Sequence, residues 1–327
     1  MKHKKKRGNL AFLIIILLLV LVFLYSGLRV LESTVFNRDQ EIEQDVPSKT
    51  IVRDGVEYFP RQDITVILLT GIDESGPVVD SGSYNNSGEA DMISLLVFDH
   101  AQEKINVLNL NRDTMLDVQV LGIGGKKAGT FYGQLALAHT YGSGLEDSCV
   151  NLRDTISDFL YGLRIDYYVS MNMDAIALLN DAVGGVTVTV RDDFSEVDPT
   201  ITMGELTLWG DQATTFVRTR QGVGNQMNVT RMERHKEYMT GFMVSLRSKL
   251  DGTDFVFSTY ERLAPYMVTD CSATTVSSIV ERYGDYELDQ VISLKGENVK
   301  GAQFMEYYVD EEAMDQVILQ YLYAPKK

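Results

Sequence analysis

Charged side chains stand at the ends of three apolar runs in this sequence. Asp73 follows ILLTGI, Asp91 lies at the start of ADMISLLVFD, and Arg112-Asp113 ends VLNLNRD. Side chains alternate along a strand, so Arg112 and Asp113 point to opposite faces and can pair only if the chain turns. The pair has two interpretations: a charged cap at a strand end, or a strand that delivers Arg112 to a ligand site at its carboxyl end.

Two of these carboxylates have the chemistry of a metal site. If the strands next to Asp73 and Asp91 are neighbours, both side chains meet at one edge of the sheet. Two hard oxygen ligands with open positions suit Mg²⁺, or Mn²⁺, which would keep waters and bind substrate phosphate. The alternative is that both aspartates only stabilise turns.

Four further arginines supply groups that bind phosphate. In TFVRTRQG, Arg218 and Arg220 are two residues apart, so an extended segment would point both to the same side. Arg231 lies in the first turn of a predicted helix, where free N–H groups favour an anion, and Arg234 follows on the same face. With Arg112, these guanidinium groups predict a phosphate clamp. The alternative is ordinary salt bridging in an acidic chain.

The pattern around these residues predicts an α/β fold. Apolar runs typical of strands cover residues 64–70, 92–99, 104–111, 166–172 and 186–190, and helices are predicted at 133–142, 150–162, 173–183 and 230–250. Thr230 to Glu233 has the form of a capping box. Asp54-Gly55 predicts a hairpin ahead of the first buried strand. Strands that alternate with helices predict helices packed on a mixed central sheet.

The amino-terminal segment predicts a membrane anchor. Residues 10–28 carry no charge, and five of the first seven residues are Lys or Arg. Nineteen uncharged residues can cross a bilayer as a helix. The positive-inside rule places residues 1–9 in the cytoplasm and the rest of the chain outside. Without those five basic residues, 25 Lys and Arg face 46 Asp and Glu, so the outer part is a poor partner for nucleic acid.

The chain has two cysteines, Cys149 and Cys271, both on the predicted outer side. An oxidising compartment permits a disulfide between them. The alternative is two separate buried thiols. Neither cysteine lies in a zinc-ligand spacing.

In combination and order, six motifs resemble those of the LytR-CpsA-Psr family of membrane-anchored cell-wall glycopolymer transferases. They are ILLTGID, ADMISLLVFD, VLNLNRDTML, DYYVSMNMDAIALLNDAVGGVTVTV, LTLWGDQATTFVRTR and NVTRMERH. The resemblance implies an α/β domain at 63–250, preceded by a stalk and lead-in hairpin at 29–62. Residues 251–327 are expected to form a C-terminal helical extension packed on the same domain.

The resemblance also implies an activity. A polyprenyl-pyrophosphate lipid would bind with its head group on arginines and Mg²⁺ and its tail in an apolar tunnel. Its glycopolymer, a teichoic acid or capsule polymer, would pass to peptidoglycan, with a pyrophosphatase side activity. We expect the helix from Met232 to Leu250 to form part of the tunnel wall, with Phe242 as one wall residue; a plain packed core is the alternative.

Site residues follow from the resemblance position by position. Asp73 and Asp91 are similar to the metal-side carboxylates, and Asp91 joins Arg112 and Asp113 in the catalytic set. Arg112, Arg218, Arg220 and Arg231 are similar to the pyrophosphate ligands, and Asp113 would brace the site or help to activate the acceptor hydroxyl. The chain departs from the family pattern at Asn228, where a carboxylate becomes an amide, and at His235; with Arg234 these are secondary site residues.

Two other functions are compatible with these motifs. The first is a module that binds the lipid carrier without turnover. The second is an envelope-linked transcriptional regulator, which ranks last because about nine cytoplasmic residues are too few for a DNA-binding domain.

Overall fold

The structure is a computed structural model that describes residues 50–122, 125–219, 221–223, 228–249 and 253–326. The predicted cytoplasmic tail, the anchor at 10–28 and most of the stalk lie outside these residues. No helix within the described ranges has the length and apolar character needed to cross a bilayer.

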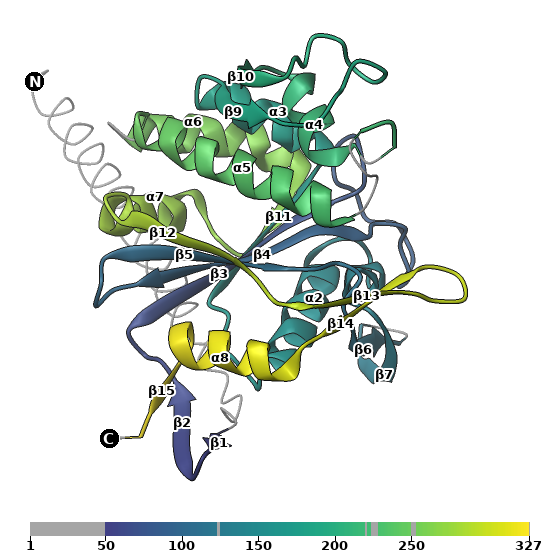
Figure 1. Cartoon of the computed structure of the whole chain (residues 1–327), viewed down its shortest axis with the longest axis vertical. Helices are drawn as coiled ribbons and strands as arrows, with labels where there is room; N and C mark the ends of the chain where they lie inside the picture. Colours follow the sequence, from purple (N-terminus) through teal and green to yellow (C-terminus); the bar gives the residue numbers. More distant parts are fainter. Residues whose placement is uncertain (1–49, 123–124, 220, 224–227, 250–252, 327) are drawn as a thin grey trace, which may run out of the picture. The chain divides into compact units, whose positions relative to one another are not determined.

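A six-stranded mixed sheet forms the centre of the described domain (Figure 1). Its strands, in spatial order, are β11 (Met267–Thr269), β8 (Tyr167–Asn172), β3 (Ile64–Ile72), β4 (Ala90–Asp99), β5 (Lys104–Leu110) and β12 (Glu287–Ser293). β3 pairs with β8 and β5 pairs with β12 in parallel, and the remaining pairs are antiparallel. The predicted α/β class with a mixed sheet is therefore confirmed.

Helices cover both faces of this sheet (Figure 1). α2 (Glu146–Phe159) and α8 (Glu311–Tyr321) pack on one face, where Leu68, Leu95 and Leu108 are buried in the main core. α5 (Asn228–Arg247) and α7 (Ala273–Tyr283) pack on the other face against a smaller cluster around Ile67, Phe98 and Ile105. The face below α5 is thus the less densely filled of the two.

A second apolar cluster lies on the far side of α5. It is built on the hairpin of β9 (Val186–Val190) and β10 (Gly204–Leu208), with α3 (Met173–Ala182), α4 (Asp211–Arg218) and α6 (Thr253–Leu263) beside it. Phe216 of α4 and Val188 of β9 are buried there, and Tyr238 and Phe242 of α5 pack against them. Phe242 therefore packs against this cluster and not against the sheet, and its role as a wall residue of a lipid tunnel stays a prediction.

The remaining elements are short. They are β1 (Ile51–Arg53), β2 (Val56–Pro60), β6 (Met115–Leu121), β7 (Lys127–Gln134), β13 (Gly296–Lys300), β14 (Met305–Val309), β15 (Tyr323–Pro325) and the 3₁₀ helices η1 (Leu135–Thr140) and η2 (Ala264–Tyr266). The predicted lead-in hairpin is confirmed: β1 and β2 are joined by Asp54 and Gly55, whose φ values are 51° and 77°. Positive φ at both positions matches the twist of the flanking strands.

Two predictions about local structure need correction. The helix predicted at 133–142 is a 3₁₀ helix at Leu135–Thr140, because Gly133 and Gln134 still pair in β7. Residues 253–326 are more than a helical extension, since β11 and β12 are strands of the central sheet. Parallel pairing of β12 with β5 joins segments about 180 residues apart, which local patterns do not reveal.

The predicted disulfide is also absent from the structure. Cys149 and Cys271 are both free and buried. The Cys149 thiol packs in the main core 3.9 Å from Nε2 of His139, whereas Cys271 follows β11 and is held by backbone bonds to Thr269 and Tyr260. Burial raises the pKa of both thiols to about 12, so neither is a reactive thiolate. The alternative of two buried thiols is the one observed.

Candidate active site

A bulge in β4 sets the position of Asp91. Gly71 pairs with Met92 and Ile72 pairs with Ala90, so Asp91 is the extra residue of β4. A bulge bends a strand and re-aims its side chain. Asp73 directly follows β3, and its N–H donates to the carbonyl of Glu89 at 3.1 Å. The strands that carry the two aspartates are therefore neighbours, as predicted.

A turn after β5 allows Arg112 and Asp113 to pair. The N–H of Thr114 donates to the carbonyl of Asn111 at 3.0 Å, and Nε of Arg112 lies 3.5 Å from Oδ1 of Asp113. Asn111 Oδ1 accepts from the N–H of Asp113 at 3.0 Å and fixes the same turn. Both interpretations of the sequence hold in part, because the strand end is capped and Arg112 is also delivered to a cluster of charges.

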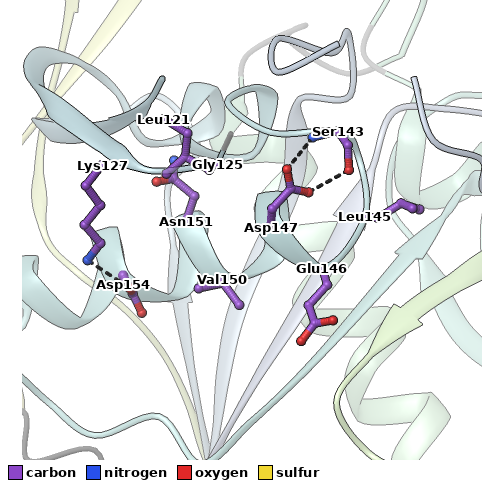
Figure 2. Close-up of a pocket in the computed structure, with 10 residues that line it drawn as sticks. All are labelled: Leu121, Gly125, Lys127, Ser143, Leu145, Glu146, Asp147, Val150, Asn151 and Asp154. Atoms are coloured by element: carbon purple, nitrogen blue, oxygen red, sulfur yellow. Dashed lines mark hydrogen bonds and ion pairs between the residues drawn. The ribbon is translucent and has the colours of Figure 1, made fainter. Parts of the chain in front are cut away.

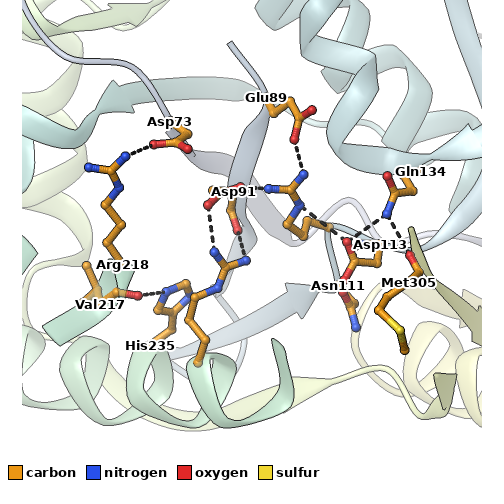
Figure 3. Close-up of polar contacts among 12 residues, drawn as sticks. Asp73, Glu89, Asp91, Asn111, Asp113, Gln134, Val217, Arg218, His235 and Met305 are labelled. Atoms are coloured by element: carbon orange, nitrogen blue, oxygen red, sulfur yellow. Dashed lines mark hydrogen bonds and ion pairs between the residues drawn. The ribbon is translucent and has the colours of Figure 1, made fainter. Parts of the chain in front are cut away.

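Asp91 is shared by two arginines (Figure 3). Arg112 pairs through Nη1 with Oδ1 of Asp91 and through Nη2 with Glu89. Nη1 of Arg231 lies 2.7 Å from Oδ2 of Asp91, and the Arg231 side chain is only 2% exposed. Nε of Arg112 is buried and makes no hydrogen bond; its ion-pair partner is Oδ1 of Asp113, 3.5 Å away.

Arg218 reaches the same edge of the sheet from α4. Its Nη2 lies 2.8 Å from Oδ1 of Asp73, and both side chains are about half exposed. Asp211–Arg218 is helical and the backbone becomes extended at Thr219, so the shared direction of Arg218 and Arg220 stays a prediction. Ala213, Phe216 and Val217 recur at helical spacing and bury one face of α4. Arg220 lies outside the described residues.

Arg234 and His235 hold the carboxyl end of α4 in place. Arg234 donates to the backbone carbonyls of Phe216 and Thr219 and lies 2.7 Å from Asp192. Nε2 of His235 binds the carbonyl of Val217 at 2.8 Å. A cation at the end of a helix stabilises its unpaired carbonyls. These two residues of α5 therefore position the helix that carries Arg218, and Arg234 is not part of the arginine group at Asp91.

His235 is neutral in this environment. Burial lowers the pKa of its imidazole to about 3, and the charges of Arg231 and Arg234 act in the same direction. The neutral ring donates its Nε2 proton to the Val217 carbonyl. Asn228 is the first residue of α5, and its side chain lies outside what the structure describes.

Two site residues were missed by the sequence analysis. Glu89 pairs with Arg112, and Gln134 donates from Nε2 to Oδ1 of Asp113 at 3.0 Å and to the carbonyl of Met305 at 2.9 Å. Figure 3 shows Gln134 and Met305 on the side of Asp113 away from Asp91. Glu89 stands two residues before Asp91 in GEAD, a spacing that could have drawn attention to it. Gln134 gave no signal, because its role depends on the β6–β7 hairpin folding back.

The charges of this site do not favour an anion by themselves. Among the described residues, Arg112, Arg218 and Arg231 face four carboxylates, those of Asp73, Glu89, Asp91 and Asp113. No group of three or more His, Cys, Asp or Glu side chains in the described ranges is arranged to hold a metal ion. The carboxylates of Asp73 and Asp91 supply two oxygen ligands, which suit a cation that takes its other ligands from phosphate and water.

A narrow cavity of about 10 Å³ leads from Asp91 and Arg112 under α5. Polar and apolar side chains line it, among them Met92, Ser94 and Asn109 of the sheet and Met232 and His235 of α5. A space of this size holds about one water molecule. Leu69, Leu96 and Val169 on the same face of the sheet are only partly buried. The cavity and these side chains lie on the face of the sheet that α5 covers.

Comparisons with known proteins agree with this arrangement. A family model described as the LytR_cpsA_psr family matches residues 25–321. The chain is 29% identical over 201 residues to a Halalkalibacterium halodurans protein named polyisoprenyl-teichoic acid–peptidoglycan teichoic acid transferase TagU; the match covers 61% of this chain and 58% of that relative. A Bacillus cereus protein of the same name is 25% identical and is matched over 87% of this chain and 86% of its own length. The solved structure of gbs0355 from Streptococcus agalactiae shares the fold, with a TM-score of 0.62, 22% identity, and coverage of 78% of this chain and 85% of that one.

Proposed function

The chain belongs to the LytR_cpsA_psr family, and on this premise we propose that it transfers a glycopolymer from a polyprenyl-pyrophosphate carrier to peptidoglycan. The observation that carries the proposal is the sharing of Asp91 by Arg112 and Arg231 at the edge of the sheet. Buried guanidinium groups held in fixed positions are suited to a diphosphate, which they bind through two parallel hydrogen bonds.

In the proposed complex, phosphate oxygens replace carboxylates as partners of the arginines. Arg218 is half exposed and can turn from Asp73 to a ligand, whereas Arg112 exchanges the partly exposed Glu89 for a phosphate oxygen and keeps Asp91 and Asp113 as braces. Arg231 is held by the first turns of α5, where the helix also favours an anion. Arg220 is the fourth proposed ligand.

A divalent cation held by Asp73 and Asp91, Mg²⁺ or Mn²⁺, would supply the positive charge that the site lacks. Four carboxylates face three described guanidinium groups, and Arg220 as a fourth would bring the site only to neutrality, so a pyrophosphate would otherwise enter a site without net positive charge. Neutralising two aspartates also releases Arg218 and Arg231 for the substrate.

The proposed reaction is a phosphoryl transfer. A hydroxyl oxygen of peptidoglycan attacks the phosphorus bonded to the glycopolymer, the P–O bond between the two phosphates breaks, and polyprenyl phosphate leaves. The protein contributes mainly positioning and charge stabilisation. Glu89 is 41% exposed and adjacent to Arg112, so we assign it as the acceptor of the hydroxyl proton. Asp113 is buried and bonded to Gln134, which fits a positioning role for Arg112.

The lipid tail is proposed to enter between the sheet and α5. Met232, Met239 and Met243 follow one another at helical spacing; Met232 lines the cavity and Met243 packs on the cluster of the sheet. Methionine side chains adapt to irregular apolar ligands. These residues are the proposed wall.

We also propose that residues 10–28 anchor the chain, with residues 1–9 in the cytoplasm and the catalytic domain outside the membrane. Protease added to intact protoplasts should digest the chain beyond residue 28. A fully protected carboxyl terminus would overturn this orientation.

The function is tested with the full chain in detergent, a labelled lipid-linked glycopolymer, Mg²⁺ and a glycan acceptor. The proposal predicts polyprenyl phosphate release together with labelled acceptor. Tight binding of the lipid with no release would instead assign a binding module. Release without labelled acceptor would assign a pyrophosphatase.

A further inference from the structure

A cleft of about 440 Å³ lies outside the site described above, between the β6–β7 hairpin and α2 (Figure 2). The hairpin contributes Leu121, Gly125 and Lys127, and α2 contributes one face through Asp147, Asn151 and Asp154. Those three residues follow one another at helical spacing, so their side chains lie along the same side of α2. The volume of the cleft is typical of a site for a small ligand.

Asn151 supplies a hydrogen-bond acceptor that the protein leaves unused. Its Nδ2 donates to the carbonyls of Gln119 at 2.9 Å and Ala138 at 2.8 Å, which fixes the orientation of the amide. The residue is 1% exposed, and its Oδ1 has no partner. Figure 2 shows the Asn151 side chain rising from α2 toward Gly125, between Asp147 and Asp154. A buried acceptor in this position calls for a donor.

The charge of the lining selects the kind of donor. Three carboxylates, those of Glu146, Asp147 and Asp154, face the single ammonium group of Lys127 in the lining. Arg153, outside the lining, pairs with Oδ1 of Asp154 at 3.1 Å, and the carboxylates of the lining still outnumber its cation. Asp147 accepts hydrogen bonds from the N–H and Oγ of Ser143. A ligand that donates hydrogen bonds and carries positive charge therefore matches both the free Oδ1 and the acidic lining.

Lys127 shows that an ammonium group fits beside Asp154. Its Nζ lies 3.0 Å from Oδ2 of Asp154, and the Lys127 side chain is 58% exposed. An exposed pair of this kind is weak and exchanges readily. Leu145 and Val150 add an apolar wall that suits the aliphatic stem of an amine.

We propose that this cleft binds a primary ammonium group on an aliphatic stem, held by Asn151 between Asp147 and Asp154, in exchange with Lys127. We assign this amine to the peptide of the peptidoglycan acceptor, an assignment that rests on the proposed transferase function. The cleft would then position the acceptor while its glycan hydroxyl reaches the arginine cluster.

The connection between cleft and active site supports this assignment. Asn86 donates from Nδ2 to Oγ of Ser148 at 3.0 Å in the first turn of α2, and Glu89, only three residues later, pairs with Arg112. Three residues of extended chain span at most about 11 Å. The β6–β7 hairpin makes a second connection, since it begins just after Asp113 and its Gln134 binds Asp113.

Binding to the full chain is measured without any lipid donor, so the outcome is independent of transfer. The probe is a synthetic disaccharide-pentapeptide with a free lysine ε-amine. Two comparison compounds are measured beside it: the same molecule with an acetylated ε-amine, and the disaccharide without the peptide. The free amine should bind best. Asp154→Asn should weaken its binding about two- to fivefold, and Lys127→Gln should tighten it by a similar factor because the internal competitor is removed.

Lys104→Gln is the matched control, since Lys104 is also an exposed lysine paired with an aspartate, Asp289, at 3.2 Å. Its affinity for the probe should equal that of the wild type. Equal binding of the free and acetylated amines, or no tightening in Lys127→Gln, would overturn the proposal. If amine-dependent binding is found but no transfer occurs, the cleft assignment stands and the transferase function does not.

Discussion

Asp91 lies between Arg112 and Arg231, with Oδ1 paired to the first and Oδ2 2.7 Å from Nη1 of the second. The side chain is aimed there by the bulge in β4, and its own exposure is only 10%. One carboxylate thereby fixes two guanidinium groups that come from separate parts of the chain.

Asp91→Asn should therefore impair both the arginines and the proposed cation. We expect turnover to fall about tenfold to a hundredfold, and the Mg²⁺ concentration for half-maximal activity to rise by a similar factor. Titration of activity with Mg²⁺ measures both effects. Asp99→Asn is the control, because Asp99 ends the same strand and pairs with Arg61 at 2.7 Å. An unchanged Mg²⁺ dependence in Asp91→Asn would remove Asp91 from the metal site.

Arg234 should behave as a structural residue. Arg234→Met leaves the carbonyls of Phe216 and Thr219 without their donor and Asp192 without its partner. The loss should destabilise the fold by about 2–4 kcal/mol. Thermal melting measures this loss, whereas turnover per folded molecule should change less than threefold or so. A large loss of turnover at an unchanged Tm would place Arg234 on the substrate.

His235 should make stability depend on pH. Its folded-state pKa is about 3, whereas an unfolded chain has a histidine pKa of about 6.5. Between these values only the unfolded state takes up the proton, so the free energy of unfolding should decrease as pH falls from about 6.5 toward 3. Denaturant melts across this range should show a shallower slope for His235→Gln. Equal slopes for the wild type and His235→Gln would contradict the buried neutral imidazole.

The wall of the proposed tail site can be tested on α5. Met243 packs toward the sheet, whereas Val244 is 71% exposed on the same helix. Met243→Asp should abolish binding of a polyprenyl-pyrophosphate lipid, because an ionised carboxylate is costly in apolar surroundings. Val244→Asp should bind like the wild type, and circular dichroism checks that both variants fold. Normal binding by folded Met243→Asp would place the tail elsewhere.

Patterns in the sequence were sufficient for the elements that carry the site. The apolar runs at β3, β4 and β5 predicted three neighbouring strands, and their charged ends predicted Asp73, Asp91 and Arg112 at one edge. The bulge that aims Asp91 could not be predicted, because it depends on the register between two strands. Helix periodicity likewise predicted α5 but not its orientation: the helix is apolar toward both the sheet and the β9–β10 cluster, so Phe242 and Met243 could not be assigned to one side.

Long-range pairing explains the other differences. The parallel contact of β12 with β5 and the folding back of the β6–β7 hairpin join distant segments, so neither the sheet's last strand nor the role of Gln134 follows from local patterns. Helix α4 was not predicted, because TFVR carries β-branched and aromatic residues that favour strands, whereas Phe216 and Val217 pack on one side of a helix in the structure.

The central claim is that Arg112 and Arg231 bind the pyrophosphate. Paired measurements of turnover and Tm on Arg112→Ala, Arg112→Lys, Arg231→Ala and Arg231→Lys test it most directly. Charge-assisted hydrogen bonds contribute about 1.5–3 kcal/mol, so each alanine variant should lose roughly tenfold to a few hundredfold in turnover per folded molecule. Lysine should restore part of the loss, since it keeps the charge without the two-pronged geometry. If Tm falls while turnover per folded molecule is retained, these arginines only hold the fold, and the active site lies elsewhere.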